Sequence, residues 1–151
     1  MIEDRAEFAQ RERFPAAIEV MHADMVEALR SMQVGWNSFL VIATRGHKLD
    51  GQCLRAAITL PSRYIGLLGS RRKTILIARM LRDEGVSEER LRAVHAPIGL
   101  DLGGRTPAEI ALAVLAEITQ ERYGGTGRAL RLSDEMHAKA VRRDPGALRP
   151  A

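Results

Sequence analysis

Two short, continuously apolar stretches alternate with longer segments in which apolar residues recur at helical spacing. Residues 38–44 form a run rich in β-branched and aromatic side chains, and residues 63–68 form a second apolar run. Runs of this length and composition are typical of strands buried on both faces of a parallel sheet. The pattern therefore predicts two such strands, each followed by a helix.

Helix-start signals place the other elements along the first half of the chain. A short strand is expected over residues 17–21, and Asp24 with Glu27 three positions later forms an N-terminal cap signature for a helix to about Met32. Asp50 is expected to cap the next helix, which Pro61 terminates.

The second half of the chain carries three further predicted helices. One follows Ser70 and runs to about residue 84, and a short one starts at Ser87. The glycine-rich residues 96–105 are expected to form a loop with a short strand at 98–100. Residues 106–109 (Thr-Pro-Ala-Glu) then combine three helix-start signals. That helix is expected to reach Tyr123, with a buried stripe formed by Ile110, Val114 and Ile118.

Strands that alternate with helices at short spacing predict an α/β fold: a Rossmann-like parallel sheet with helices on both faces. In such sheets ligands bind beyond the carboxyl ends of the strands. The turns at residues 44–50 and 68–72 each follow a strand and open a helix, so both are expected at that edge. Glu3 and Asp4 are expected there as well, because they follow two apolar residues that resemble the end of a strand.

The opening residues 1–5 resemble the end of a strand whose beginning is absent, and the fingerprint Gly-x-Gly-x-x-Gly does not occur in the chain. In the doubly wound fold that fingerprint follows the central first strand. If Asp4 ends the second strand, where an acid faces a ribose hydroxyl, the sheet lacks its first strand and glycine loop. Its unpaired backbone groups then predict a complementing chain, a homodimer or a rearranged sheet.

Length and charge set the domain organisation. The 151 residues, 46% hydrophobic, suffice for one domain over residues 1–123 followed by a basic, flexible tail over 124–151. The tail holds six cations and three anions, so it carries +3 of the net charge of +4. A near-neutral body with few aromatic residues argues against nucleic-acid binding. We find no apolar run of membrane-spanning length and no secretory signal, so a cytoplasmic protein is expected.

The turn from the second apolar run into its helix has the composition of an anion site. Gly69 and Ser70 form a small-residue corner, and Arg71, Arg72 and Lys73 open the helix. Cations in a first turn oppose the helix dipole at a cost of roughly 0.3–1 kcal/mol each, which a bound phosphate would offset. The alternative is that these side chains pair with acidic residues of neighbouring loops.

Other reactive residues give weaker signals. His47 stands beside Lys48 and Asp50 at the expected ligand edge, and the alternative is a solvated loop histidine. The remaining histidines have no companions at metal-ligand spacing, and Ser70 lies in no Gly-x-Ser-x-Gly elbow, so neither a metal site nor a hydrolase is predicted. Cys53, the single cysteine, is expected to be a small apolar residue on a helix face.

Four motifs in register resemble the C-terminal Rossmann domain of the xanthine dehydrogenase accessory protein family (XdhC/CoxI), whose members are molybdenum cofactor chaperones. The resemblance extends over residues 1 to about 123. It rests on residues 3–9 with 12–15 (EDRAEFA, ERFP), residues 43–47 with 49–50 (ATRGH, LD), residues 64–72 (YIGLLGSRR), and residues 95–101 with 105–107 (HAPIGLD, RTP).

The resemblance implies a protein that binds the molybdenum cofactor (molybdopterin) in transit and delivers it to a molybdenum hydroxylase such as xanthine dehydrogenase. A cysteine desulfurase is a further implied partner. We expect the cofactor phosphate to bind a cradle of Gly69, Ser70, Arg71 and Arg72. The neighbouring polar contacts are expected from His47 and Asp50, with Asp101 and Asp4 as further candidates.

Two departures from the family pattern leave other functions open. Family members usually carry an N-terminal cysteine-containing domain and the glycine loop, and this chain has neither. Cys53 therefore does not take the role of those cysteines. The alternatives are an NAD(P)-binding oxidoreductase subunit that uses the same sheet edge, and a degenerate interaction module that docks to the enzyme it serves. No catalytic residue is assigned.

Overall fold

Two parallel strand pairs form the strand layer of the computed structural model, which describes residues 1–142. β1 (Ile2–Glu3) pairs with β2 (Met21–His22), and β3 (Phe39–Ile42) pairs with β4 (Tyr64–Leu67). The second pair is in register from Phe39 opposite Tyr64 to Ile42 opposite Leu67. His95 forms a single parallel bridge with Gly66, which adds one paired residue beside β4. The fold is α/β and Rossmann-like, as predicted.

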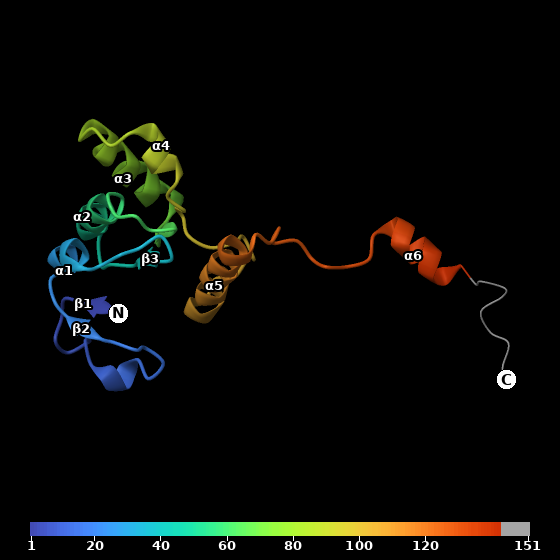
Figure 1. Ribbon diagram of the computed structural model, residues 1–151, viewed down its shortest axis with the longest axis horizontal. Coiled ribbons are helices and arrows are strands. Elements are labelled where there is room, and N and C mark those ends of the chain that lie inside the picture. Colours follow the sequence, from blue (N-terminus) through green and yellow to red (C-terminus); the bar gives the residue numbers. More distant parts are fainter. Residues whose placement is uncertain (143–151) are drawn as a thin grey trace.

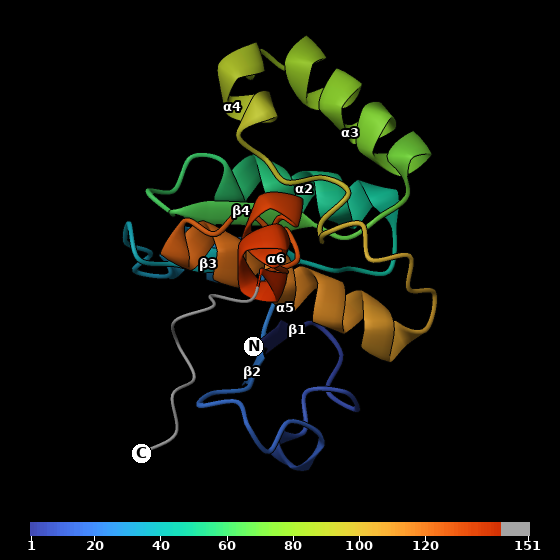
Figure 2. The ribbon, with the colours of Figure 1, turned by 90° about the vertical axis from the view of Figure 1, so that its right-hand side faces the viewer.

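The helices lie on both sides of the strands (Figures 1 and 2). α1 (Met25–Ser31), α2 (His47–Ala57), α3 (Arg71–Asp83) and the short α4 (Glu88–Arg92) gather on one side. α5 (Pro107–Tyr123) lies on the opposite side of β3 and β4, and a single 3-10 turn (Arg11–Arg13) interrupts the loop between β1 and β2. This arrangement fixes the carboxyl ends of the strands beside the starts of α2 and α3.

The hydrophobic core lies between the β3–β4 pair and helices α1, α2 and α3. Its central residues are nearly inaccessible to solvent: Leu67 is 1% exposed, Leu81 0% and Ala57 0%. Burial of a leucine of this kind stabilises the fold by roughly 1.5–3 kcal/mol. The core therefore holds the strands against α2 and α3, whose first turns carry the candidate site.

Helix α5 begins as predicted but is less buried than its apolar periodicity suggested. Thr106 and Glu109 form a complete capping box, and Gly124 ends the helix in the left-handed conformation at φ 71°. The prediction of a buried stripe on α5 is wrong, because no residue of α5 is fully buried and Ile110 is 38% exposed. The reason is that the strand surface opposite Ile110 is left open beside β3.

Three predicted boundaries require correction. α2 begins at His47 with Gly46 as its cap residue, so Asp50 lies within the first turn and is not the cap. The carboxylate of Asp50 instead accepts hydrogen bonds from Thr44. The strand predicted at residues 98–100 is absent, because Gly99 at φ 105° turns the chain away after one bond from Ile98 to β4. The strand predicted at 17–21 forms only at Met21–His22.

The segment after α5 extends away from the strands (Figure 1). All residues from 124 to 142 are exposed, and this segment contains one short helix, α6 (Asp134–Val141). The remainder of the predicted tail, residues 143–151, lies outside the described residues. Among residues 1–142 no helix combines the length and the apolar character needed to cross a membrane.

Candidate functional site

The start of α3 presents unpaired backbone donors at the carboxyl end of β4. Ser70 is the cap residue, and its hydroxyl accepts a hydrogen bond from the Lys73 amide at 3.3 Å. The amides of Arg71 and Arg72 have no hydrogen-bond partner in the described part of the chain. Free amides at a helix N-terminus carry partial positive charge, so this end of α3 can bind an anion.

Arg71 and Arg72 add two positive charges to these amides. Both side chains are exposed, and within residues 1–142 neither forms an ion pair. The alternative of pairing with acidic loop residues is therefore not realised in the described structure. Two guanidinium groups beside free amides form a donor set that suits a phosphate or a carboxylate.

Lys73, the third cation, has a structural partner. Its ammonium group forms an ion pair with the carboxylate of Asp50, which is 0% exposed, and also donates to the Leu68 carbonyl at 3.2 Å. The other oxygen of Asp50 accepts from the Thr44 amide at 3.0 Å and from the Thr44 hydroxyl at 2.8 Å. This network ties the turn after β3 to the first turn of α3.

The burial of Asp50 changes its predicted contribution. A side chain without solvent exposure positions Thr44 and Lys73 and presents no free carboxylate at the surface. The sequence pattern indicated Asp50 and Lys73 separately, but it did not predict the ion pair between them. The signal that could have joined them is a charged residue in each turn that follows a predicted neighbouring strand.

His47 is the first residue of α2 and is exposed. In the described part of the chain its ring forms no hydrogen bond and no ion pair. Gly46, which precedes it, offers no side chain to cap the helix. The start of α2 is thus a second exposed helix N-terminus at the same edge, following β3 as α3 follows β4.

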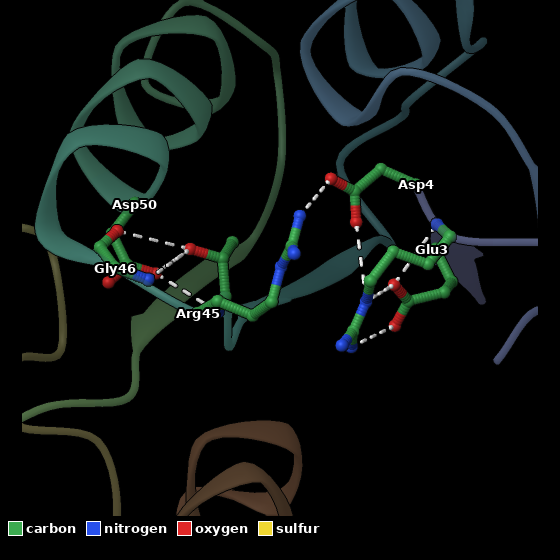
Figure 3. A network of polar contacts seen from close by, with 7 residues as sticks. Glu3, Asp4, Arg45, Gly46 and Asp50 are labelled. Carbon is green, nitrogen blue, oxygen red and sulfur yellow. Dashed lines mark hydrogen bonds and ion pairs between the residues drawn. The ribbon is translucent and has the colours of Figure 1, made fainter.

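Asp4 follows β1 and is joined to the turn after β3 (Figure 3). Its carboxylate pairs with Arg45 at 2.7 Å, although the two residues belong to separate strand pairs. The adjacent Glu3 binds Arg5 at 2.8 Å, and this hydrogen bond lowers the pKa of Glu3 to about 2. Asp4 therefore lies at the ligand edge, as predicted, but its carboxylate is paired with Arg45.

Asp101 lies apart from the other predicted site residues. It is exposed in the loop after Leu100 and lines a separate hollow of about 360 Å³ with Arg105 and Ile110. Within residues 1–142 it forms no ion pair or hydrogen bond with Ser70, Arg71 or His47. The structure thus brings Asp4, His47, Asp50 and the start of α3 to one strand edge and leaves Asp101 in the loop that precedes α5.

A half-buried polar cluster surrounds Glu117 of α5, and no sequence pattern indicated it. The Glu117 carboxylate accepts hydrogen bonds from the Tyr64 hydroxyl and the Gly99 amide, both at 2.7 Å, and lies 3.2 Å from Nδ1 of His95. Burial acts to raise the pKa of Glu117, but the hydrogen bonds from Tyr64, Gly99 and His95 together lower it below its usual value. This cluster attaches α5 to β4.

The two other titratable groups of the core behave as structural residues. Burial and the hydrogen bond to Glu117 raise the pKa of Tyr64 far above its usual value. Burial, followed by the nearby Asp50 carboxylate, raises the pKa of Cys53 to about 11. Cys53 is therefore a neutral thiol at physiological pH, in agreement with its predicted role as an apolar residue.

Comparison with known proteins identifies this arrangement of motifs. The family model of the XdhC Rossmann domain matches residues 1–118. The chain belongs to the XdhC Rossmann domain family. The match covers β1 to most of α5, so the XdhC domain includes every part of the candidate site described above.

Relatives of this XdhC domain are considerably longer proteins. The uncharacterised protein YqeB of Escherichia coli is 39% identical over 117 residues, which cover 77% of this chain and 21% of YqeB. A Bacillus subtilis protein, named as a probable xanthine dehydrogenase component, is 31% identical over 109 residues, covering 72% of this chain and 31% of that protein. The chain thus spans about a fifth to a third of these relatives.

A solved structure supports the fold of the XdhC domain. The crystal structure of a xanthine dehydrogenase from Bacillus halodurans superimposes with a TM-score of 0.70 and is 24% identical. The match covers 90% of this chain and 38% of the other. The likeness confirms the Rossmann-like fold.

Proposed function

We propose that this XdhC domain is part of an accessory protein of a molybdenum hydroxylase such as xanthine dehydrogenase, and that it binds the phosphate of the molybdenum cofactor at the start of α3. The observation that carries the proposal is the pair of exposed arginines, Arg71 and Arg72, beside two amides without partners in the described residues. A doubly charged phosphate accepts hydrogen bonds from both kinds of donor.

The residues at the start of α3 suit such a ligand. Gly69 has no side chain, and a Cβ there would approach Cδ of Lys73 to 2.9 Å, so the corner is closely packed against the lysine. Lys73 is in turn held by Asp50, which keeps its ammonium within the protein and leaves the outer surface to Arg71 and Arg72. His47, exposed at the start of α2, is the neighbouring side chain proposed to contact the pterin.

The proposed client follows from the relatives. The Bacillus subtilis relative is named as part of a xanthine dehydrogenase, and molybdenum hydroxylases of this class use the cofactor that the proposal assigns. When bound, the cofactor supplies the redox chemistry of the client enzyme, whereas this chain binds and orients its phosphate. A cysteine desulfurase partner stays a prediction from the family resemblance.

The proposal is tested by titrating the purified protein with molybdopterin released anaerobically from a molybdenum hydroxylase, and separately with NAD. We expect Arg71→Ala/Arg72→Ala to weaken molybdopterin binding at least about tenfold, because each charge-assisted hydrogen bond contributes about 1.5–3 kcal/mol. The matched control is Arg128→Ala/Arg131→Ala, which removes the same charge from the exposed segment after α5.

Two outcomes would contradict the cofactor proposal. Equal affinity of the wild type and the Arg71→Ala/Arg72→Ala variant would remove the proposed cradle. Binding of NAD in preference to molybdopterin would favour an oxidoreductase function, since NAD also carries phosphates that suit this edge.

A further inference from the structure

The loop before α5 borders an open hollow whose polar groups are not part of the proposed phosphate site. The hollow has a volume of about 360 Å³, and its apolar lining includes Ile98, Leu100 and Ile110. Its polar groups come from four residues of the loop, Asp101, Gly103, Gly104 and Arg105. An apolar hollow of this size with a few polar groups has the character of a small-ligand site.

Hydrogen bonds to α5 hold both ends of this loop. At its start, the Gly99 amide donates to the Glu117 carboxylate at 2.7 Å, and the Leu100 amide donates to the backbone of α5. At its end, the Arg105 amide donates to the Glu109 carboxylate at 2.9 Å. The residues between these anchors are thus held in a fixed shape, as a binding site requires.

The middle of the loop keeps its hydrogen-bonding groups free. Within residues 1–142, the Asp101 carboxylate and the Arg105 guanidinium form no ion pair and no hydrogen bond. The amides of Gly103 and Gly104 also lack partners in that range. Gly103 has a φ of 76°, a conformation that residues with a side chain rarely adopt. The loop therefore offers the hollow one two-oxygen acceptor and several donors.

The charges around the hollow disfavour an anion. Glu109 accepts from the amides of Arg105 and Thr106, so the capping box already uses donors at the start of α5. Asp101 and Glu109 also place two carboxylates in this region against the single guanidinium of Arg105. The start of α3 has the opposite balance. The hollow is therefore better matched to an uncharged ligand that both donates and accepts hydrogen bonds.

The free groups of the loop match the edge of a 2-amino-pyrimidin-4-one ring. The amino group and the neighbouring ring N–H of this edge are adjacent donors, and one carboxylate can accept from both. The ring carbonyl beside them accepts from a guanidinium or a backbone amide. Adenine and nicotinamide do not have this order of two donors and one acceptor. The flat ring itself suits an apolar lining.

The hollow lies on the same side of the molecule as the proposed phosphate site. Figure 2 shows the first turns of α2, α3 and α5 on one side, together with the loop before α5. The Ile98 amide donates to the Leu67 carbonyl at 3.0 Å, so the loop begins beside the end of β4. Gly69, the first residue of the proposed phosphate cradle, is two positions after Leu67.

A larger open groove lies beside α5 and is separate from this site. It has a volume of about 910 Å³, and Val41 of β3 contributes to its lining. The groove shares Ile98 and Ile110 with the hollow, but none of residues 101–105 lines it. The polar groups of the hollow are therefore independent of what covers the groove.

We propose that the hollow binds the edge of a 2-amino-pyrimidin-4-one ring. Asp101 accepts from the two adjacent donors of the ring, and Arg105 donates to its carbonyl together with the free glycine amides. Pterins and guanine share this edge. The pterin of the molybdenum cofactor is the assigned source, and this assignment rests on the proposed function. The phosphate at the start of α3 and the pyrimidine ring at Asp101 are then opposite ends of one ligand.

The test compares pterin with lumazine, which carries a carbonyl oxygen in place of the 2-amino group. Both compounds fluoresce, so their binding to the full chain is followed by fluorescence titration. We expect the wild type to bind pterin at least about tenfold more tightly than lumazine, because lumazine directs an acceptor at the Asp101 carboxylate. Asp101→Asn should reverse this preference, since the new amide donates to the lumazine oxygen.

Two further variants identify the contacts. Arg105→Gln should weaken the binding of pterin and lumazine by the same factor, because both compounds carry the carbonyl that Arg105 contacts. Asp134→Asn is the matched control for Asp101→Asn, since it removes the same charge from an exposed position on α6. It should leave the preference for pterin unchanged.

Several results would overturn the proposal. Failure of the wild type to bind pterin would contradict it, as would equal affinity for pterin and lumazine or an unchanged preference in Asp101→Asn. A titration with guanosine tests the source of the edge, because tighter binding of guanosine than of pterin would reject the assignment to the cofactor.

Inorganic phosphate separates this proposal from the phosphate site at α3. Its binding, measured by calorimetry, should be lost in Arg71→Ala/Arg72→Ala and retained in Asp101→Asn. Phosphate binding without discrimination between pterin and lumazine would reject the hollow alone. Discrimination between the two pteridines without an effect of the arginine variant on phosphate would reject the phosphate site alone.

Discussion

The buried carboxylate of Asp50 in α2 is paired with the ammonium group of Lys73 in the first turn of α3. Lys73 directly follows the exposed Arg71 and Arg72 in the first turn of α3, and its pair with Asp50 joins the starts of α2 and α3 at the ligand edge. A buried carboxylate is costly without its partner, whereas the loss of both charges together is tolerated far better.

Replacement of Lys73 should therefore destabilise the fold strongly. We expect Lys73→Met to lower the free energy of unfolding by about 3 kcal/mol, because it leaves the charge of Asp50 buried and unpaired. The double variant Asp50→Leu/Lys73→Met should recover part of the loss. Urea unfolding followed by circular dichroism measures both changes.

Arg55→Met provides a control for the Lys73 prediction. Arg55 also forms an interhelical ion pair, with Glu84, but both side chains are about half exposed. Its loss should cost less than about 1 kcal/mol. Equal effects of Lys73→Met and Arg55→Met would show that burial of Asp50 does not determine the strength of the Lys73 interaction.

The attachment of α5 through Glu117 and Tyr64 should make the stability of the fold sensitive to acid. The pKa of Glu117 is lower in the folded chain than in the unfolded chain, so its contribution is complete above the unfolded value and is lost as the pH falls through the folded value. Unfolding free energy should therefore fall from about pH 5 downward.

Glu117→Gln should remove this part of the pH dependence. At neutral pH the variant should be about 1–3 kcal/mol less stable, because the amide replaces a charged acceptor of hydrogen bonds from Tyr64 and Gly99. Urea unfolding at a series of pH values compares the two proteins. An unchanged slope between about pH 5 and pH 3 in the variant would assign the acid sensitivity to other carboxylates, such as Glu3.

The close packing of Gly66 in β4 against Ile98 leads to a further prediction. A Cβ at Gly66 would overlap the Ile98 side chain and lie 2.9 Å from Cε1 of Tyr64. We expect Gly66→Ala to lower the free energy of unfolding by about 1–3 kcal/mol through overpacking. Thermal and urea unfolding measure the change.

Two further variants define the cause of that change. Ile98→Val removes the methyl group that the new Cβ would overlap, so the double variant should lose less stability than the sum of the two single variants. Gly35→Ala, at a position with open space, should change stability by less than about 0.5 kcal/mol. Strict additivity of Gly66→Ala and Ile98→Val would refute the overpacking explanation.

The sequence by itself determined the local elements and their order. Asp24 and the Thr106–Glu109 pair cap their helices as predicted, and α3 begins directly after Ser70 as expected, because each of these signals joins residues at most three positions apart and depends on little else. Apolar runs likewise predicted β3 and β4, and the motifs in register predicted the XdhC family that the comparisons confirm.

Only the tertiary structure decided which charged residues are exposed donors and which are structural. Asp50 and Lys73 lie on different helices, and Tyr64 and Glu117 are 53 residues apart, so no local pattern joins either pair. The sequence likewise did not predict the open groove beside α5. Helical periodicity reveals an apolar face, but it does not show whether another element covers that face. Local hydrogen bonds are encoded over a few residues, whereas burial and ion pairing depend on how distant elements meet.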